Sequence, residues 1–186
     1  MDITIDVTNT IIETDRLILR PWQKCDLDDF YEYASVEGVG EMAGWRHHTS
    51  IDISKEILGS FISEKNVFAI EYKEDNKVIG SLGLHWSWAN DESEYANLKV
   101  KEIGYVLSKA YWGKGLMPEA VKAVIRYCFK ECKLDALTVG HFVINDQSRR
   151  VIEKCGFAFV KNSEYYSKQL ETTFKDKKYI IFNNDN

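Results

Sequence analysis

The stretch Ala110-Tyr-Trp-Gly-Lys-Gly-Leu-Met-Pro-Glu-Ala120 places two glycines around a lysine, just before an apolar run with helical spacing. Glycine tolerates left-handed backbone angles, so Gly113 and Gly115 predict a tight turn between a strand and a helix. The first N–H groups of a helix have no partner within the helix and carry partial positive charge. Such a turn can hold an anion such as a pyrophosphate, with Lys114 as a nearby cation. A purely structural turn would show the same short motif, so the flanking sequence has to decide.

Two common phosphate-binding motifs do not fit this turn. A Walker loop requires Gly-x-x-x-x-Gly-Lys-Ser/Thr, which the chain lacks. A dinucleotide-binding fingerprint requires a third glycine where this chain has Pro118. Both of these nucleotide-binding folds are therefore disfavoured.

The hydrophobic pattern around the turn predicts an alternation of strands and helices. Strands are expected at residues 16–20, 67–72, 77–84, 98–107 and 136–143, with two short ones within 165–182. Helices are expected at residues 27–36, 53–64 and 117–131, with a last one that starts at Asn145 or Asp146 and ends at Lys154 before Gly156. Short connections make the first strands antiparallel, and helix 117–131 makes strand 136–143 parallel to strand 98–107. The pattern predicts an α+β sheet with one crossover.

Length and composition indicate one folded domain over residues 1–186. Hydrophobic residues make up 45% of the chain and aromatic residues 13%, enough to bury a core without metals or disulfides. The formal charge of −5 disfavours nucleic acid or an anionic membrane as the main partner. The first residues lack the cationic and apolar regions of a signal peptide, and no apolar run is long enough to span a membrane. A cytoplasmic protein is expected.

The four cysteines are expected to be reduced. They are Cys25, Cys128, Cys132 and Cys155, and none of them forms a CxxC pair. Cys128 and Cys132 lie one helical turn apart, which is a poor geometry for a structural disulfide. No His or Cys cluster has the spacing of a zinc finger or a metalloprotease, so no metal site is predicted.

Motifs on both sides of the turn resemble the GNAT acetyltransferase superfamily. They are Thr14-Asp-Arg-Leu-Ile-Leu-Arg-Pro21, Glu102-Ile-Gly-Tyr-Val-Leu107, Tyr111-Trp-Gly-Lys-Gly-Leu-Met-Pro-Glu-Ala120, Asn145-Asp-Gln-Ser148 and Glu153-Lys-Cys-Gly-Phe157. They follow the family's order, and the resemblance spans residues 14–182. More narrowly, the chain resembles the branch that includes ribosomal-protein alanine N-acetyltransferases.

The resemblance implies a mixed, mostly antiparallel sheet of six to seven strands with a splayed central pair, flanked by about four helices. Acetyl-CoA would lie in the cleft between the splayed strands, with its pantetheine arm along the backbone of Tyr105, Val106 and Leu107. Its pyrophosphate would meet the amides of Trp112, Gly113, Lys114, Gly115, Leu116 and Met117. The family usually has Gln or Arg at the position of Trp112 and Gly or Ala at that of Met117. Because these contacts are chiefly with the backbone, cofactor binding is still expected.

The resemblance also implies residues for catalysis. Asn145 matches a cofactor-contacting asparagine, and it can also serve as a helix N-cap. Many members protonate the leaving thiolate with a tyrosine, but this chain has Ile152 at that position. Ser148 matches a serine proposed for this role in the ribosomal-protein branch, and it can equally be a solvent-facing residue of the first helical turn. Glu102 is the first candidate for the general base, although a strand glutamate can also be simply exposed.

A second cluster, Gly44-Trp-Arg-His-His48, lies between the two early helices, on the acceptor side in this family. Trp45 can anchor the loop, whereas His47 or His48 can act as a base or orient a substrate, because imidazole titrates near neutral pH. Trp86 is expected to form a wall of the same pocket.

The sequence therefore predicts an acyl-CoA-dependent N-acetyltransferase. It would transfer acetyl from acetyl-CoA to a primary amine of a protein N-terminus or small molecule, by direct attack in a ternary complex. The expected partners are acetyl-CoA and this amine, with no nucleic acid and no membrane, and the enzyme would be a monomer or homodimer. The loss of the usual tyrosine keeps open a non-catalytic CoA-binding regulatory module. A nucleotide-phosphate enzyme is a third alternative.

Overall fold

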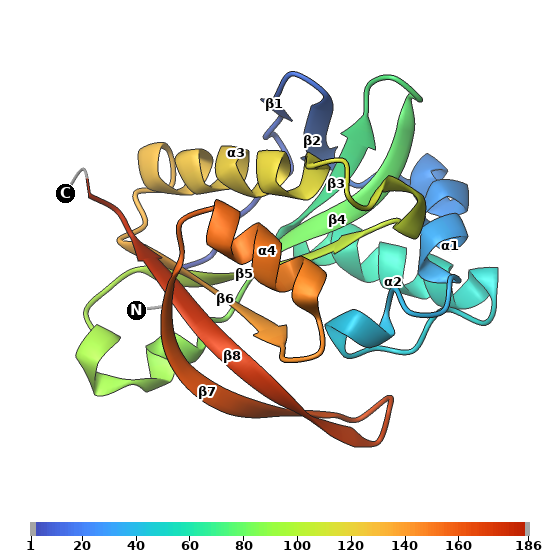
Figure 1. The fold of residues 1–186 in the computed structure, drawn as a ribbon. Coiled ribbons are helices and arrows are strands. Elements are labelled where there is room, and N and C mark those ends of the chain that lie inside the picture. Colours follow the sequence, from blue (N-terminus) through green and yellow to red (C-terminus); the bar gives the residue numbers. More distant parts are fainter. Residues whose placement is uncertain (1–2, 185–186) are drawn as a thin grey trace.

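A computed structural model describes residues 3–184, which form one eight-stranded sheet with four α-helices. The strands are β1 (Ile12–Glu13), β2 (Leu17–Pro21), β3 (Val67–Tyr72), β4 (Lys77–His85), β5 (Val100–Leu107), β6 (Ala136–Phe142), β7 (Ala158–Ser167) and β8 (Thr172–Phe182). The helices are α1 (Leu27–Ala34), α2 (Ile51–Glu64), α3 (Leu116–Lys130) and α4 (Asp146–Lys154). The order across the sheet is β1-β2-β3-β4-β5-β6-β8-β7 (Figure 1). Only β5 and β6 pair in parallel.

The predicted α+β class is confirmed, but the predicted count of six to seven strands was too low. The two-residue strand β1 is too short to leave a periodic pattern. β7 begins at Ala158, seven residues before the predicted tail strands, because most of its side chains are exposed at the sheet edge and show no apolar alternation. The other predicted elements are present, with ends within two residues of those expected.

The side chains of the sheet alternate between two helical layers. In β3, Phe68 and Ile70 belong to the core formed with α3 and α4, whereas Val67 and Ala69 belong to the core formed with α1 and α2. All four side chains are buried, so the strand is apolar on both faces. The sheet is thus covered by α3 and α4 on one face and by α1 and α2 on the other (Figure 1).

β5 and β6 separate after a short pairing. Their register includes only Val100 with Ala136, Lys101 with Leu137 and Glu102 with Thr138. On its other side, β5 stays paired with β4 as far as Leu107. The second half of β5 therefore has a strand neighbour on one side only, which confirms the predicted splayed central pair.

The β7–β8 hairpin extends along the sheet edge beyond the splay (Figure 1). Near its tip, the Ser167 hydroxyl donates a hydrogen bond to the carbonyl oxygen of Gly44 at 2.7 Å. The backbone N–H of Arg46 donates to Oε1 of Gln169 at 3.0 Å. These bonds hold the segment between α1 and α2 against the hairpin, which closes one side of the space beside the splayed strands.

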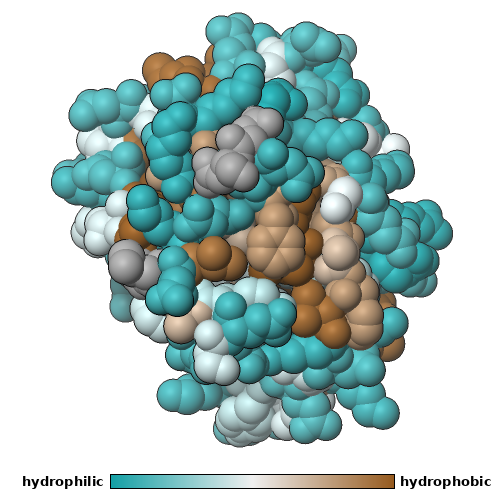
Figure 2. Space-filling view, turned by 90° about the vertical axis from the view of Figure 1, so that its left-hand side faces the viewer, coloured by the Kyte–Doolittle hydropathy of each residue, from teal (hydrophilic) through white to brown (hydrophobic). Residues whose placement is uncertain are grey.

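The side of the molecule drawn in Figure 2 is largely hydrophilic, with hydrophobic side chains gathered from its middle toward the right and again at its upper edge. Large hydrophobic residues with exposed side chains include Phe159 on β7 and Phe182 on β8. None of the helices within residues 3–184 has both the length and the apolar character needed to cross a membrane.

Candidate functional site

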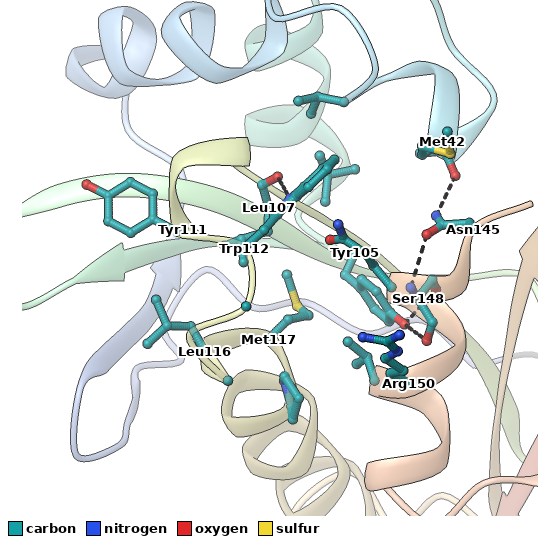
Figure 3. Close-up of a pocket in the computed structure, with 18 of the residues that line it drawn as sticks. Met42, Tyr105, Leu107, Tyr111, Trp112, Leu116, Met117, Asn145, Ser148 and Arg150 are labelled. Carbon is teal, nitrogen blue, oxygen red and sulfur yellow. Dashed lines mark hydrogen bonds between the residues drawn. The ribbon is translucent and has the colours of Figure 1, made fainter.

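A first cavity, of about 310 Å³, lies where β5 ends and α3 and α4 begin. Its lining includes nine of the ten residues predicted to bind the cofactor, together with Ser148. The nine are Tyr105, Val106, Leu107, Trp112, Gly113, Gly115, Leu116, Met117 and Asn145. Arg150 and Lys154 of α4 add two cationic side chains to the lining (Figure 3). The cavity therefore suits an elongated ligand with an anionic part.

The turn before α3 has the backbone geometry that its glycines predict. Gly113 and Gly115 have φ values of +77° and +75°, which residues other than glycine adopt only at a cost in free energy. Gly115 is the N-cap residue of α3, and no side chain of the described residues caps this helix start. The first amides of α3 are therefore available to an anion.

Arg16 and Glu119 fasten this turn to the strand β2. Nε of Arg16 donates to Oε2 of Glu119 at 2.8 Å, and an NH1 hydrogen of Arg16 goes to the carbonyl oxygen of Lys114 at 2.9 Å. Thr14 Oγ donates to Oε1 of Glu119 at 2.6 Å. Burial alone would raise the pKa of Glu119, but the bonds from Thr14 and Arg16 outweigh it and lower the pKa. We call these residues, Thr14, Arg16 and Glu119, the loop latch.

Lys114 is the one predicted cofactor residue that does not line the first cavity. Its ammonium lies over the ring of Tyr111, 4.8 Å from the ring centre. Trp112 lines the cavity while its indole N–H donates to the carbonyl oxygen of Leu107 at 2.8 Å (Figure 3). This bond joins the turn to the end of β5, so Trp112 has a structural role of its own.

Asn145 is the helix cap that the sequence allowed, and it also lines both cavities, so its predicted contact with the cofactor stays a prediction. Its Oδ1 accepts the backbone N–H of Ser148 at 3.0 Å, which caps α4. Its Nδ2 donates to the carbonyl oxygen of Met42 at 3.2 Å, and its side chain lines both cavities (Figure 3). Asn145 thus connects α4 to the segment between α1 and α2.

The hydroxyls of Tyr105 and Ser148 form a hydrogen bond of 2.8 Å (Figure 3). Burial raises the pKa of Tyr105 and keeps its phenol protonated. Ile152, where many family members have a tyrosine, is 1% exposed and belongs to the core. The tyrosine hydroxyl at this site therefore comes from β5 and not from α4.

A second cavity, of about 990 Å³, lies between the sheet and the layer of α1 and α2. It shares the lining residues Met42, Ala43, Tyr105, Val106, Asn145 and Ser148 with the first cavity. The two cavities therefore meet beside the second half of β5, where the strands have separated. A ligand in one can contact a ligand in the other at this junction.

Glycines on three strands form part of the floor of the second cavity. They are Gly83, Gly104 and Gly140. A Cβ atom at Gly83 would lie 2.2 Å from Nε2 of His85, and one at Gly140 would lie 3.1 Å from Nζ of Lys178. The missing side chains leave room for the polar groups that stand on this floor.

Glu102, predicted as the general base, stands on this floor beside Lys178 and Asp176. Nζ of Lys178 lies 3.7 Å from Oε1 of Glu102 and 2.8 Å from Oδ2 of Asp176. The Thr138 hydroxyl donates to Oε2 of Glu102 at 3.4 Å. Burial raises the pKa of Glu102 above its usual value and outweighs the opposing Lys178 charge. A carboxylate with a raised pKa in a cavity is suited to accept a proton.

His85 is a second proton acceptor on the floor, opposite Glu102 on the neighbouring strand. Its imidazole reaches solvent within the cavity, and the desolvation there lowers its pKa, which favours the neutral form. The sequence analysis missed His85, because the predicted strand ended one residue before it. Pairing of strands 77–84 and 98–107 was the signal that could have placed it beside Glu102.

Trp45, His47 and His48 all line the second cavity, as predicted. Nδ1 of His47 lies 2.8 Å from Oε1 of Glu41, and Nδ1 of His48 lies 2.7 Å from the Ser54 hydroxyl. His48 is 7% exposed, and burial lowers its pKa. These contacts hold both rings in the cavity wall through Nδ1.

Trp86, predicted for the same pocket, lines neither cavity. Its side chain is 55% exposed, and its indole N–H points to Oδ2 of Asp91 at 3.5 Å. The four cysteines also lie outside both linings. Within residues 3–184, no group of three or more His, Cys, Asp or Glu side chains is arranged to hold a metal ion.

Comparisons with known proteins agree with this geometry. Residues 16–158 match the acetyltransferase (GNAT) domain. YoaA of Bacillus subtilis, described as an uncharacterized N-acetyltransferase, is 27% identical over 176 residues, 92% of this chain and 96% of its own length. YjcK of the same species, described as a probable N-acetyltransferase, is 38% identical over 94 residues, 50% of this chain; the match spans 49% of that relative's length.

A solved structure shows the same fold over nearly the whole chain. The ribosomal-protein-S5-alanine acetyltransferase from Vibrio fischeri is 19% identical, with a TM-score of 0.70, and the match covers 95% of this chain and 98% of that one. The likeness supports the predicted resemblance to this branch in fold. With more than half of the sequence matched by the domain, the chain belongs to the GNAT family and is an acetyl-CoA-dependent N-acetyltransferase.

Proposed function

We propose that this enzyme transfers the acetyl group of acetyl-CoA to a primary amine by direct attack within a ternary complex. The observation that carries the proposal is the meeting of the two cavities beside Tyr105 and Val106. The first cavity would hold the cosubstrate and the second the acceptor. No covalent enzyme intermediate is needed, and no cysteine lines either cavity among the described residues.

The residues present fit acetyl-CoA. The uncapped start of α3 and the two glycines before it offer amides to the pyrophosphate. The half of β5 that has no β6 partner offers backbone groups to the pantetheine arm. When bound, acetyl-CoA supplies the acetyl group and a thiolate leaving group.

In the proposed reaction, Glu102 removes a proton from the acceptor ammonium, directly or through water. The neutral nitrogen then forms a bond to the thioester carbonyl carbon as the carbon–sulfur bond breaks. Ser148 gives its hydroxyl proton to the leaving thiolate and regains one from Tyr105, to which it is hydrogen bonded. The nitrogen gives up its second proton as the amide forms, and this proton passes through water to the Ser148–Tyr105 pair, so that both hydroxyls are restored. The products are the N-acetylated amine, CoA and one proton, which leaves through Glu102 to solvent. His85 is the second candidate for the base, on its lowered pKa.

A non-catalytic CoA-binding module is not favoured. The absence of a tyrosine at Ile152 suggested it, but Tyr105 brings a phenol to the same junction. A nucleotide-phosphate enzyme is not supported by a chain that matches the GNAT domain.

The proposal can be tested by thiol release from acetyl-CoA across peptides, polyamines, aminoglycosides and arylalkylamines. At least one amine should accelerate release, and Glu102→Gln should lower kcat by 100-fold or more, in the range of general base catalysis, about 10²–10⁴. Calorimetry should show unchanged acetyl-CoA affinity in the variant. Tight acetyl-CoA binding with no acceleration by any amine would contradict the proposal.

A further inference from the structure

The second cavity has a balanced set of charges. Its lining has two carboxylates, Glu102 and Asp176, and two permanent cations, Arg46 and Lys178, so its formal charge is zero with neutral histidines. Lys178 contacts both carboxylates, at 3.7 and 2.8 Å. All four histidines of the chain also line the cavity, and each would add positive charge on protonation. The lining therefore has no excess of negative charge for a polycation.

Two groups of aromatic side chains form parts of the wall of this cavity. Phe30, Trp45 and His48 form one group, with ring centres of 5.3 Å between Phe30 and His48 and 5.1 Å between Trp45 and His48. Phe142 and Tyr165 form the other, with centres 5.6 Å apart. Such a wall favours a flat apolar body, which gains from both burial and ring contacts.

The buried hydroxyl of Tyr33 lines the same cavity. Tyr33 is 2% exposed, and its hydroxyl makes no hydrogen bond of normal geometry, although the Ser81 side chain of the same lining lies near it. A bound molecule or water can complete the hydrogen bonding of such a buried hydroxyl. The volume of about 990 Å³ is at the upper end of the range for small-molecule sites.

We propose that the acceptor is a primary monoamine attached to an aromatic body. This inference rests on the proposed function and names its substrate class. The single ammonium would be placed by Glu102, whose contact with Lys178 is longer, 3.7 Å, than the 2.8 Å contact of Asp176. The ring would lie against Trp45 and Tyr165, one from each aromatic group. Both free arylalkylamines and peptides with an aromatic N-terminal residue share this chemistry.

A polyamine is the contrasting acceptor. Its second ammonium would need a second carboxylate, but Asp176 is already paired with Lys178 at 2.8 Å. A like charge near Lys178 or Arg46 would be repelled, at a cost that grows as water is excluded. A polyamine also has no flat apolar surface that could pack against the aromatic side chains of the cavity.

Equilibrium binding of amines to the CoA-saturated enzyme tests the class independently of turnover. Phenethylamine and a phenylalanine-initiated peptide amide should be compared with spermidine and an aminoglycoside, with thiol release measured in parallel. One or both aromatic amines should bind at least tenfold more tightly than spermidine. The ratio of the two aromatic affinities shows whether a free arylalkylamine or a peptide N-terminus is preferred. Equal or tighter binding of spermidine, or no binding of either aromatic amine, would overturn the class.

Three aromatic-to-alanine variants provide a matched set. Trp45→Ala and Tyr165→Ala, from the two aromatic groups, should each weaken phenethylamine binding at least fivefold, whereas Trp86→Ala should leave it unchanged. Lys178→Gln should raise spermidine affinity relative to phenethylamine at least threefold, because it leaves Asp176 without its cation. An unchanged affinity for acetyl-CoA shows that a variant is still folded. Wall variants that bind phenethylamine like the wild type would also overturn the class.

The two proposals fail separately. Aromatic amines that bind selectively but never release thiol would contradict acetyl transfer and leave the binding class standing. Thiol release with polyamines alone would support acetyl transfer and overturn the aromatic monoamine class.

Discussion

The hydroxyl oxygen of Tyr105 lies 2.8 Å from that of Ser148, although the two residues are 43 positions apart in the chain. Tyr105 comes from β5 and Ser148 from the first turn of α4, so the bond forms only when both elements pack beside the splay. Both residues line both cavities. In the proposed ternary complex, the pair would lie where a leaving thiolate needs a proton.

Tyr105→Phe and Ser148→Ala should each lower kcat by about 10- to 100-fold, because each removes one hydroxyl from the proposed proton path. The KM for acetyl-CoA should change less than threefold. If the two hydroxyls act as a unit, the double variant should be no slower than the slower single variant. Steady-state thiol release measures all three, and multiplicative losses in the double variant would argue against a shared path.

As the pH is lowered, kcat/KM should fall with an apparent pKa above 4.5, the ordinary value for glutamate. The reason is that burial raises the pKa of Glu102 and the base works only when it is ionised. The groups that face it are Lys178 and Asp176 of β8, Thr138 of β6, the Trp88 backbone and His85 of β4. Lys178 opposes the shift, so Lys178→Met should move the limb to still higher pH. A pH profile of thiol release measures this, and a limb that moves to lower pH would contradict Glu102 as the base.

The loop latch should affect cosubstrate binding through the phosphates. Glu119→Gln weakens the hold on Arg16, which in turn holds the carbonyl of Lys114. The KM for acetyl-CoA should rise about tenfold, since small displacements of positioning groups are costly. Acetyl-pantetheine lacks the pyrophosphate, so its KM should stay within twofold of the wild-type value. An equal loss with both thioesters would indicate a general packing defect.

Glu41 should stabilise the wall of the second cavity in a pH-dependent way. Burial raises its pKa, but bonds from His47 and Gly38 outweigh this and lower the pKa to about 2. The lowered value means that the stabilisation is present above pH 4.5 and is lost as the pH falls toward 2. Glu41→Gln should cost about 1 kcal/mol at pH 6, because it weakens hydrogen bonds to a charged group in a partly exposed site.

Urea unfolding of the wild type and Glu41→Gln at pH 6 and pH 2.5 measures this difference. The gap between the two proteins should shrink at the lower pH. A gap that is the same at both pH values would show that the charge of Glu41 contributes nothing.

The local parts of the site could be predicted from sequence. The turn around Gly113 and Gly115 and the cap at Asn145 depend on residues close together in the chain, where spacing carries the information. The resemblance added the cleft between β5 and β6. Nearly all predicted cofactor residues line the first cavity, with Lys114 as the exception because its side chain lies over Tyr111.

The acceptor side could not be predicted to the same extent, because distant segments form it. Lys178 approaches Glu102 through the pairing of β6 with β8, and neither sequence neighbourhood contains a sign of the other. Tyr165 reaches the cavity from β7, an exposed edge strand without an apolar pattern. Trp86 shows the opposite error, since an aromatic residue just after a strand suggested a pocket that it does not line.

The early separation of β5 from β6 has a consequence for the way this enzyme can be observed. Beyond Glu102, β5 is no longer paired with β6. A pantetheine arm lying in the gap would hydrogen bond to the backbone of β5 in place of the missing strand. Amide hydrogen exchange in residues 103–107 should therefore slow when CoA is added, while β3 should change little. If the cosubstrate binds as proposed, it completes the sheet beside β5, and the exchange protection of residues 103–107 measures the fraction of enzyme that carries CoA.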